Sequence, residues 1–157
     1  HILSFKGTKR RMNILGKLKK TIFIDDYAHH PTEIEKLINV ISLYKKKNVC
    51  LIIEPHRYSR LNDLYAEYLS VLKNVKNLII LKTYEAGESY KKGMKNSKNL
   101  VNDLNVLYNQ KTKYIDNYSD LFSLLDEYVK NQRDSIIISA GAGEISNQIR
   151  FFYDSRK

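Results

Sequence analysis

One short stretch of the chain, Asp25–Glu33, concentrates side chains that can do acid–base chemistry. It reads DDYAHHPTE and carries two adjacent carboxylates, a phenol and two adjacent imidazoles. An imidazole exchanges a proton near pH 7, and a carboxylate accepts hydrogen bonds or pairs with a cation. These groups could serve only to cap a helix and cover the end of a strand, but their number on one turn favours a functional site.

A second polar segment, Pro55–Arg60, reads PHRYSR and places guanidinium groups three residues apart, on Arg57 and Arg60. Two guanidiniums near one point can hold a carboxylate or a phosphate with paired N–H donors. Cations at the start of a helix are electrostatically unfavourable unless an anion neutralises them. The segment therefore predicts an anion-binding site, with a pair of ordinary surface arginines as the alternative.

A metal site is another possible use of the histidines. It would take its nitrogen ligands from His29, His30 or His56. Asp25 or Asp26 would then supply an oxygen ligand. The spacing matches no zinc-binding pattern, and adjacent histidines seldom point at one ion, so we predict no metal site among these residues.

Both polar segments follow an apolar run and precede an amphipathic helix. Thr21–Ile24 and Val49–Glu54 read as buried strands. Pro31 and Glu33 mark the start of a helix that is predicted to run to Tyr44. The carboxyl ends of parallel strands lie at one edge of a sheet, where open α/β sheets hold ligands. We therefore expect the imidazoles and guanidiniums to share a single crevice.

The remaining sequence continues this alternation of strands and helices. Further strands are predicted at Met12–Leu15, Asn77–Leu81, Thr112–Ile115 and Ser135–Ser139. Further helices are predicted at Leu61–Leu72, Leu100–Tyr108, Tyr118–Val129 and in a last segment ending near Phe152. Gly16 and Lys17 should turn the first strand back as an edge hairpin, and Tyr90–Asn99 should form a mobile loop. Apolar runs without alternation imply burial on both faces of a mostly parallel sheet, hence a three-layer α/β/α sandwich.

Length and composition fit one folded domain, residues 1–157, with 43% hydrophobic and 11% aromatic residues. The net charge of +10 is spread over the ends of predicted elements, so we favour solvated faces over nucleic-acid binding. The single cysteine, Cys50, lies in an apolar run and indicates a buried thiol in a reducing compartment, the cytoplasm. We find no signal peptide and no apolar run of membrane-spanning length. Because the chain opens at His1, we expect a piece of a longer protein.

The sequence lacks the elements that would drive a reaction by themselves. No GxxxxGK[ST] phosphate-binding loop is present, and no serine or cysteine stands in a recognisable nucleophile motif. Gly141-Ala142-Gly143 follows a strand, but Ser146 replaces the third glycine of the dinucleotide-binding pattern. A tight turn whose backbone approaches the site is the better interpretation of this segment.

Five segments follow one another along the chain: GTKRRM, DDYAHHPTE, EPHRYSR, TYEAGE and GAGEI. In order and spacing they resemble the C-terminal domain of the Mur ligase family, and within it the branch that joins L-alanine to UDP-N-acetylmuramate in peptidoglycan biosynthesis. The resemblance implies a Rossmann-like domain of a three-domain enzyme, with the UDP-sugar-binding and ATP-binding domains outside this chain. It also implies ATP and Mg²⁺, an acyl-phosphate intermediate, and partners in the other domains of the same ligase rather than nucleic acid or membrane.

The resemblance also implies roles for individual residues. The L-alanine pocket is expected to comprise Tyr27, His29, His56, Arg57 and Arg60, with the arginines on the carboxylate. Arg11 and Asp26 should face the nucleotide when the domain closes, which makes Arg11, Asp26 and His29 the expected catalytic groups. An imidazole suits removal of a proton from the attacking amine, and an arginine suits developing phosphate charge.

Two features bear on alternatives to this assignment. The family often reads RRFE where this chain has Arg10-Arg11-Met12-Asn13, so a contact that depends on that glutamate is in doubt. A related ligase that attaches a whole tripeptide during peptidoglycan recycling shares the DD-aromatic-AHHPT turn but carries a Ser-Asn pair in place of HRYSR. His56-Arg57-Tyr58-Ser59-Arg60 therefore favours alanine addition. A non-enzymatic basic module that binds nucleic acid or an acidic protein remains the alternative from another class.

Overall fold

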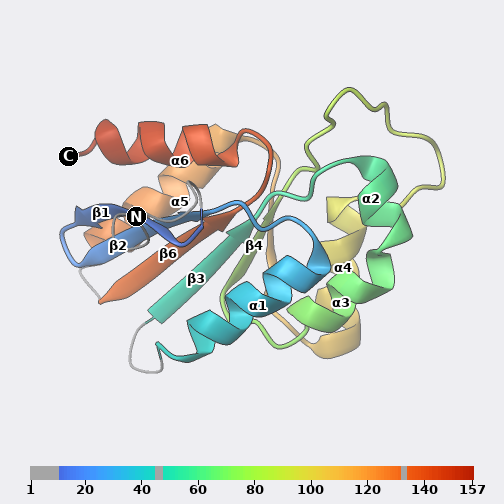
Figure 1. Cartoon of the computed structure of the whole chain (residues 1–157), viewed down its shortest axis with the longest axis horizontal. Coiled ribbons are helices and arrows are strands. Elements are labelled where there is room, and N and C mark those ends of the chain that lie inside the picture. The colour runs from blue at the N-terminus through green and yellow to red at the C-terminus, as the bar shows by residue number, and fades with distance from the viewer. Residues whose placement is uncertain (1–10, 45–47, 132–133) are drawn as a thin grey trace, which may run out of the picture.

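The computed structural model describes residues 11–44, 48–131 and 134–157. These residues form a six-stranded sheet in the order β1-β2-β6-β3-β4-β5, in which only β1 runs antiparallel to its neighbour (Figure 1). The strands are β1 (Asn13–Leu18), β2 (Thr21–Asp26), β3 (Asn48–Ile53), β4 (Leu78–Leu81), β5 (Lys113–Ile115) and β6 (Ser135–Ala140). The predicted Rossmann-like architecture, a mostly parallel sheet with an antiparallel edge hairpin, is confirmed.

Helices cover both faces of the sheet. They are α1 (Pro31–Ser42), α2 (Tyr58–Asp63), α3 (Tyr65–Leu72), α4 (Ser97–Tyr108), α5 (Tyr118–Lys130) and α6 (Ile145–Asp154). The first four pack on one face and the last two on the other (Figure 1). The chain advances from β2 to β3, β4 and β5 over the first face and returns to β6 under the second. The reversal of direction beside β6 makes the carboxyl ends of β2, β6 and β3 the place where the sheet opens a crevice.

Two apolar cores fill the space on either side of the sheet. Ile24, Leu51 and Ile138 point into the core beneath α1, α3 and α4, whereas Phe23, Cys50 and Ile137 point into the core beneath α5 and α6. Adjacent strand residues thus enter opposite cores, as the pleat requires, so a run such as Ser135–Ala140 is buried throughout. Burial also raises the pKa of the Cys50 thiol to about 11, which keeps this free cysteine protonated, as the buried-thiol prediction expects.

The edge hairpin turns later than predicted. Gly16 lies inside β1, at a shift of register between Ile14 and Gly16, and the turn falls at Lys19, which has a positive φ of 51°. A Cβ on Gly16 would lie 1.9 Å from the hydroxyl oxygen of Tyr153, and its φ is +147°. The glycine therefore permits the close approach of α6 to the edge strand, and the prediction that Gly16-Lys17 forms the turn was wrong.

Three helix boundaries also differ from prediction. The predicted helix Leu61–Leu72 is two helices, because the backbone breaks at Leu64 (φ −107°, ψ 24°). Helix α4 begins at Ser97, since the side chain of Asn96 accepts hydrogen bonds from the first turn; part of the loop predicted at Tyr90–Asn99 is therefore helical. Helix α1 ends at Ser42 rather than Tyr44.

Some predictions fall outside the described residues, namely most of GTKRRM (residues 7–10) and the lysines at 45–47. None of the helices in residues 11–44, 48–131 and 134–157 has the length and apolar composition needed to cross a bilayer.

Candidate functional site

The start of α1 fixes the geometry of the histidine turn. The Nδ1 atom of His30 accepts the N–H of Thr32 at 3.3 Å, and Oε2 of Glu33 accepts the N–H groups of His29 and His30 at 3.1 and 3.2 Å. With Pro31 at the first helical position, this is a complete capping box. Burial opposes ionisation of Glu33, but these donors and the adjacent imidazoles outweigh it and lower its pKa. His30 thus serves the helix, and His29 is the histidine left to face the crevice.

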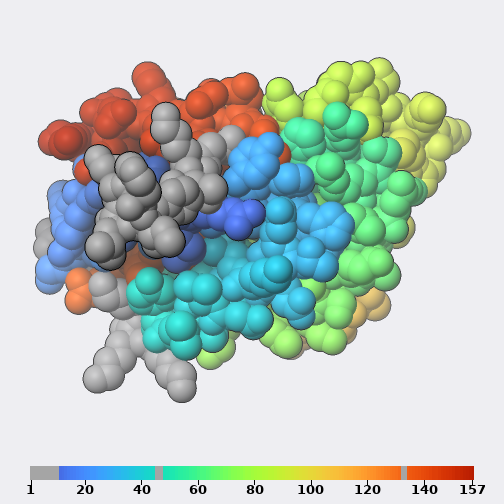
Figure 2. All heavy atoms as spheres, in the orientation of Figure 1, coloured from blue at the N-terminus to red at the C-terminus, as the bar shows by residue number. Residues whose placement is uncertain are grey.

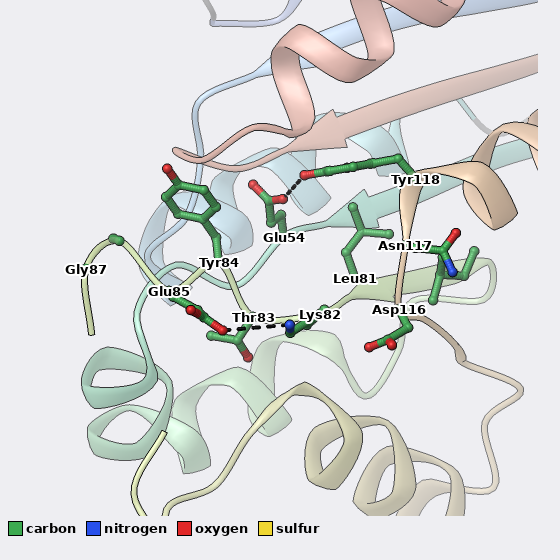
Figure 3. Close-up of a pocket in the computed structure, with 12 residues that line it drawn as sticks. Glu54, Leu81, Lys82, Thr83, Tyr84, Glu85, Gly87, Asp116, Asn117 and Tyr118 are labelled. Atoms are coloured by element: carbon green, nitrogen blue, oxygen red, sulfur yellow. Dashed lines mark hydrogen bonds and ion pairs between the residues drawn. The ribbon is translucent and has the colours of Figure 1, made fainter. Parts of the chain in front are cut away.

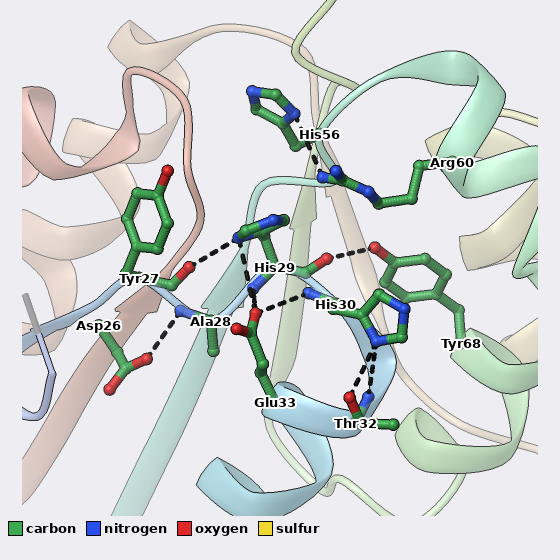
Figure 4. A network of polar contacts seen from close by, with 10 residues as sticks. All are labelled: Asp26, Tyr27, Ala28, His29, His30, Thr32, Glu33, His56, Arg60 and Tyr68. Atoms are coloured by element: carbon green, nitrogen blue, oxygen red, sulfur yellow. Dashed lines mark hydrogen bonds and ion pairs between the residues drawn. The ribbon is translucent and has the colours of Figure 1, made fainter.

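Hydrogen bonds determine the tautomer of His29. Its Nδ1 atom lies 3.0 Å from the carbonyl oxygen of Tyr27 and 3.6 Å from Oε2 of Glu33 (Figure 4). Both neighbours are acceptors, so Nδ1 carries the proton and Nε2 of the neutral ring keeps a lone pair. The backbone is held as well, because the hydroxyl of Tyr68 donates to the carbonyl of His29 at 2.5 Å. The imidazole is therefore oriented from both sides with its basic nitrogen available.

The exits of β2 and β3 converge although β6 lies between these strands. The ring centroids of His29 and His56 are 5.8 Å apart, and those of Tyr27 and His29 are 5.2 Å apart. Arg60, in the first turn of α2, reaches back so that its Nη1 lies 3.4 Å from Nδ1 of His56 (Figure 4). The turn before α1 and the start of α2 also adjoin on the molecular surface (Figure 2). The phenol of Tyr27, both imidazoles and the guanidinium of Arg60 therefore lie together where β2 and β3 end.

His56 is held in a different protonation pattern from His29. A guanidinium can only donate, so Nδ1 of His56 accepts from Arg60. Burial, together with the positive charges of Arg60 and Arg57, lowers the pKa of His56 below its ordinary value of 6.5. Its ring stacks on Tyr84 with centroids 5.4 Å apart. His56 is consequently neutral at pH 7, and its lone pair is already engaged.

Arg57 occupies an unusual backbone position. Its φ of 70° and ψ of 135° lie outside the regions that a side-chain-bearing residue normally adopts, and its N–H donates to the carbonyl of Tyr84 at 2.8 Å. In the described part of the chain neither Arg57 nor Arg60 forms a salt bridge. The guanidinium of Arg60 therefore lies beside His56, and the charge of Arg57 acts on the same imidazole, without a salt bridge to a carboxylate among the described residues.

The sequence argument for that anion site needs one correction. It rested partly on cations at a helix start that lacked a neutralising anion, but Glu88 supplies one. Its carboxylate accepts the N–H of Ser59 at 3.0 Å and the hydroxyl of Ser59 at 2.6 Å, at the first turn of α2. The helix dipole is thus already balanced, and the argument now rests on the unpaired guanidinium groups.

Arg11 and Asp26 lie in a neighbouring hollow rather than in the histidine crevice. This hollow has a volume of about 290 Å³, and Arg11, Asp26, Tyr27 and Lys36 are among its lining residues. The carboxylate of Asp26 is almost fully buried and accepts the N–H groups of Met12 at 2.8 Å and of Ala28 at 2.7 Å. Asp26 therefore ties the start of β1 to the end of β2, and the hollow is lined by two cations, Arg11 and Lys36, and by a second carboxylate, Glu33.

Asp25 is turned away from all of these groups. Its side chain is fully buried on the α6 face, where it accepts hydrogen bonds from Arg150 Nη2 at 2.9 Å and Ser146 Oγ at 2.7 Å. The carboxylates of DDY thus lie on opposite faces of β2. The metal alternative that paired Asp25 with the histidines has no support in this geometry.

Sequence reasoning missed a group of residues at the ends of β3, β4 and β5. They line a cavity of about 440 Å³ that includes Glu54, Lys82, Tyr84, Glu85 and Tyr118 (Figure 3). Burial raises the pKa of Glu54, although the hydroxyl of Tyr118 and the N–H of Ile145 donate to its carboxylate. Glu54 ends the run that was predicted to be a buried strand, but no local pattern indicates that Tyr118 and Ile145 bind its carboxylate.

The GAGEI turn closes over the same glutamate. A Cβ on Gly143 would lie 2.3 Å from Oε2 of Glu54 and 2.6 Å from Cγ of Tyr84. A Cβ on Gly141 would lie 2.8 Å from Cγ2 of Ile145. The glycines therefore let the β6 exit pack against the β3 exit, next to His56. This turn is a close backbone approach, as predicted for Gly141-Ala142-Gly143.

The chain was compared with known proteins. The family model described as Mur ligase, glutamate ligase domain, matches residues 10–143. Two curated proteins named UDP-N-acetylmuramate–L-alanine ligase are similar in sequence. The protein of Campylobacter curvus is 38% identical over 98% of this chain and 35% of its own length. The protein of Carboxydothermus hydrogenoformans is 31% identical over 96% of this chain and 31% of its own length. The chain spans about a third of the length of these relatives.

Two solved structures share the fold. The UDP-N-acetylmuramate–alanine ligase of Thermotoga maritima superposes with a TM-score of 0.72 at 21% identity, covering 98% of this chain and 32% of that chain. The murein peptide ligase of Psychrobacter arcticus superposes with a TM-score of 0.71 at 16% identity, covering 98% and 31%. The predicted resemblance is confirmed, and the chain belongs to the Mur ligase family, in which it corresponds to the glutamate ligase domain.

Proposed function

We propose that the full-length protein is the ATP-dependent ligase that joins L-alanine to UDP-N-acetylmuramate in peptidoglycan biosynthesis, and that this domain binds the alanine. One observation carries the proposal: Arg60 contacts His56 beside the paired rings of His29 and His56, and neither Arg60 nor the adjacent exposed Arg57 has a salt-bridge partner among the described residues. That arrangement suits a small zwitterion with an anionic and a cationic end. The names of the curated relatives support this choice of amino acid and sugar nucleotide.

The two ends of the amino acid would meet different groups. The guanidiniums of Arg57 and Arg60 would hold the carboxylate through N–H donors. The ammonium must lose a proton before the amine can attack, and Nε2 of His29 is the nitrogen with a free lone pair. His56 cannot serve as readily, because Arg60 already donates to its Nδ1 atom. Tyr27 would cover the pocket beside His29.

The nucleotide would contact the neighbouring hollow. Bound ATP would supply the phosphoryl group that converts the sugar lactate carboxylate to an acyl phosphate. Arg11 and Lys36 line the hollow and would pair with phosphate oxygens, and the carboxylates of Asp26 and Glu33 line it as well. Asp26 would orient the lining of this hollow through its hydrogen bonds to the N–H groups of Met12 and Ala28. The described residues contain no group of three or more metal-binding side chains.

Steady-state kinetics of the full-length enzyme test the proposal. Removing a charge-assisted hydrogen bond costs about 1.5–3 kcal/mol, so Arg57→Ala should raise the KM for L-alanine roughly 10- to 150-fold with little change for ATP. Arg57→Lys should recover only part of this loss, because an ammonium cannot bind a carboxylate with a paired fork. Arg156→Ala, which removes the same charge at the end of α6, is the control and should leave the KM unchanged.

Two results would refute this assignment. An unchanged KM for L-alanine in both Arg57→Ala and Arg60→Ala would remove the arginines from the alanine site. Preference of the wild-type enzyme for a free muropeptide-type tripeptide over L-alanine would instead place the protein with the murein peptide ligases.

A further inference from the structure

The TYEAGE segment, Thr83–Glu88, has been given no part in binding L-alanine, yet it is hydrogen-bonded to the loop that carries Arg57. The N–H of Tyr84 donates to the carbonyl of Pro55 at 2.8 Å, and the N–H of Arg57 donates to the carbonyl of Tyr84 at 2.8 Å. These bonds form a short parallel bridge between His56 and Tyr84. The exit of β4 is therefore the element against which the exit of β3 is held.

Glu88 ends this segment and makes its most specific contact. One carboxylate oxygen accepts the N–H of Ser59 at 3.0 Å, and the other accepts the hydroxyl of Ser59 at 2.6 Å. Arg57, the residue at the N-cap position of α2, makes no side-chain capping bond. Glu88 thus supplies from another loop the acceptor that a helix start normally takes from its own cap residue.

The contact is electrostatic as well as geometric. Hydrogen bonds from the hydroxyl and the N–H of Ser59, and the charge of Arg57, lower the pKa of Glu88, so it is a carboxylate at neutral pH. A negative charge at this place favours the start of a helix. It also balances part of the repulsion between Arg57 and Arg60, which no salt bridge relieves in the described residues.

Holding α2 at Ser59 fixes the guanidinium of Arg60 relative to His56, and with it the backbone from which Arg57 projects. The chain must pass through the left-handed conformation of Arg57 (φ 70°) to enter α2, and this conformation is unfavourable unless its surroundings hold it. Arg60 can reach His56 only if α2 begins where it does. We propose that Glu88 is a positioning residue for L-alanine recognition: by clamping Ser59 it sets the two arginines at the spacing that binds the carboxylate. This inference rests on the proposed function.

Kinetics of the full-length enzyme separate this role from general structural support. Glu88→Ala should raise the KM for L-alanine about tenfold, while kcat and the KM for ATP stay within about twofold, because only the arginine spacing is disturbed. Ser59→Ala, which keeps the N–H donor, should shift the same KM by a smaller factor. The double variant should raise the KM for L-alanine no more than Glu88→Ala alone does, since both changes act through one contact. Glu88→Asp, one methylene shorter, should restore part of the affinity.

Glu85→Ala is the matched control. Glu85 belongs to the same segment and contacts Lys82 at 3.7 Å and the Tyr58 hydroxyl at 3.4 Å, but no bond joins it to the backbone of α2. It should leave the KM for L-alanine within about twofold.

The outcomes are distinguishable from failure of the proposed function. If Glu88→Ala and Ser59→Ala leave the alanine KM unchanged while Arg57→Ala raises it, the positioning role is wrong and the function stands. If kcat and both KM values deteriorate together in Glu88→Ala and Ser59→Ala, the clamp is only structural and the inference is also overturned. If Arg57→Ala itself has no effect on the KM for L-alanine, the result contradicts the proposed function of the site and not only the positioning role of Glu88.

Discussion

The buried pair formed by Asp25 and Arg150 allows a quantitative test of how this sheet is stabilised. The carboxylate of Asp25 is fully buried, and its Oδ2 accepts from Arg150 Nη2 at 2.9 Å and from Ser146 Oγ at 2.7 Å. The side chain of Arg150, in contrast, is 40% exposed. Arg150→Ala would therefore remove a guanidinium donor from a carboxylate that is fully buried.

Two opposing considerations set the size of the effect. Removing one partner of a fully buried pair costs about 3–5 kcal/mol, because the remaining charge is uncompensated. The exposure of Arg150 means that solvent already screens part of the attraction, and the hydroxyl of Ser146 remains as a donor. We therefore expect Arg150→Ala to lower the free energy of unfolding by about 2–3 kcal/mol, and Tm by about 4–12 °C.

Asp25→Asn should lower the free energy of unfolding by about 1–2 kcal/mol, which is less than the effect of Arg150→Ala. The amide can still accept the hydroxyl of Ser146, and the half-exposed guanidinium of Arg150 can turn into water. In the double variant neither the buried charge nor the guanidinium of Arg150 remains. The double variant should therefore lose about 1–2 kcal/mol less free energy of unfolding than the two single variants lose in sum.

Urea unfolding of the wild type and the three variants measures these quantities at one pH. A loss below about 0.5 kcal/mol for Arg150→Ala, which is the range of an ordinary surface substitution, would contradict the assignment of a stabilising buried pair. Additive single effects would contradict it independently. In the full-length enzyme Arg150→Ala should leave the KM for L-alanine unchanged, since Asp25 faces away from the histidine crevice.

Two further predictions concern Glu54 and the turn above it. Gly143→Ala should lower the free energy of unfolding by about 1–3 kcal/mol in urea, because its Cβ would lie 2.3 Å from Oε2 of the buried Glu54; wild-type stability would show that the turn has room to shift. Glu54→Gln should gain in stability relative to wild type as pH rises above 4.5, the ordinary pKa of a glutamate. Burial raises the pKa of Glu54, so the folded wild type binds the extra proton and loses stability on charging, which the amide cannot do. A stability difference that does not change between pH 4 and pH 8 would contradict this sign.

The order of strands and helices could be predicted from the sequence because burial on both faces leaves a strong pattern. Residues 135–140 are buried without exception, and a continuous apolar run reports that condition directly. The start of α1 was equally predictable, since Pro31 fixes its own φ and Glu33 accepts hydrogen bonds from residues three and four positions before it. Local chemistry of this kind needs no knowledge of the tertiary structure.

Features that depend on distant segments left no such signal. Gly16 was interpreted as a turn residue, but what demands a glycine there is the hydroxyl of Tyr153, which arrives from α6 at the other end of the chain. Glu88 was part of a motif, yet only the pairing of the β3 and β4 exits brings its carboxylate to Ser59. In both cases the constraint lies on a contact between elements, and no periodicity encodes its partner.

The two aspartates of the histidine turn show how a small boundary error changes a chemical conclusion. The apolar run suggests that β2 stops at Ile24, and beyond a strand adjacent side chains can point to the same site. The ladder instead extends to Asp26. Since strand residues alternate between faces, Asp25 follows Phe23 into the α5–α6 side and meets Arg150, whereas Asp26 follows Ile24 toward the α1 side and lines the Arg11 hollow. The pleat therefore makes one carboxylate of the pair a structural anion and leaves the other at the edge of the site. Polar residues after an apolar run are best tested for alternation before they are assigned together to one active site.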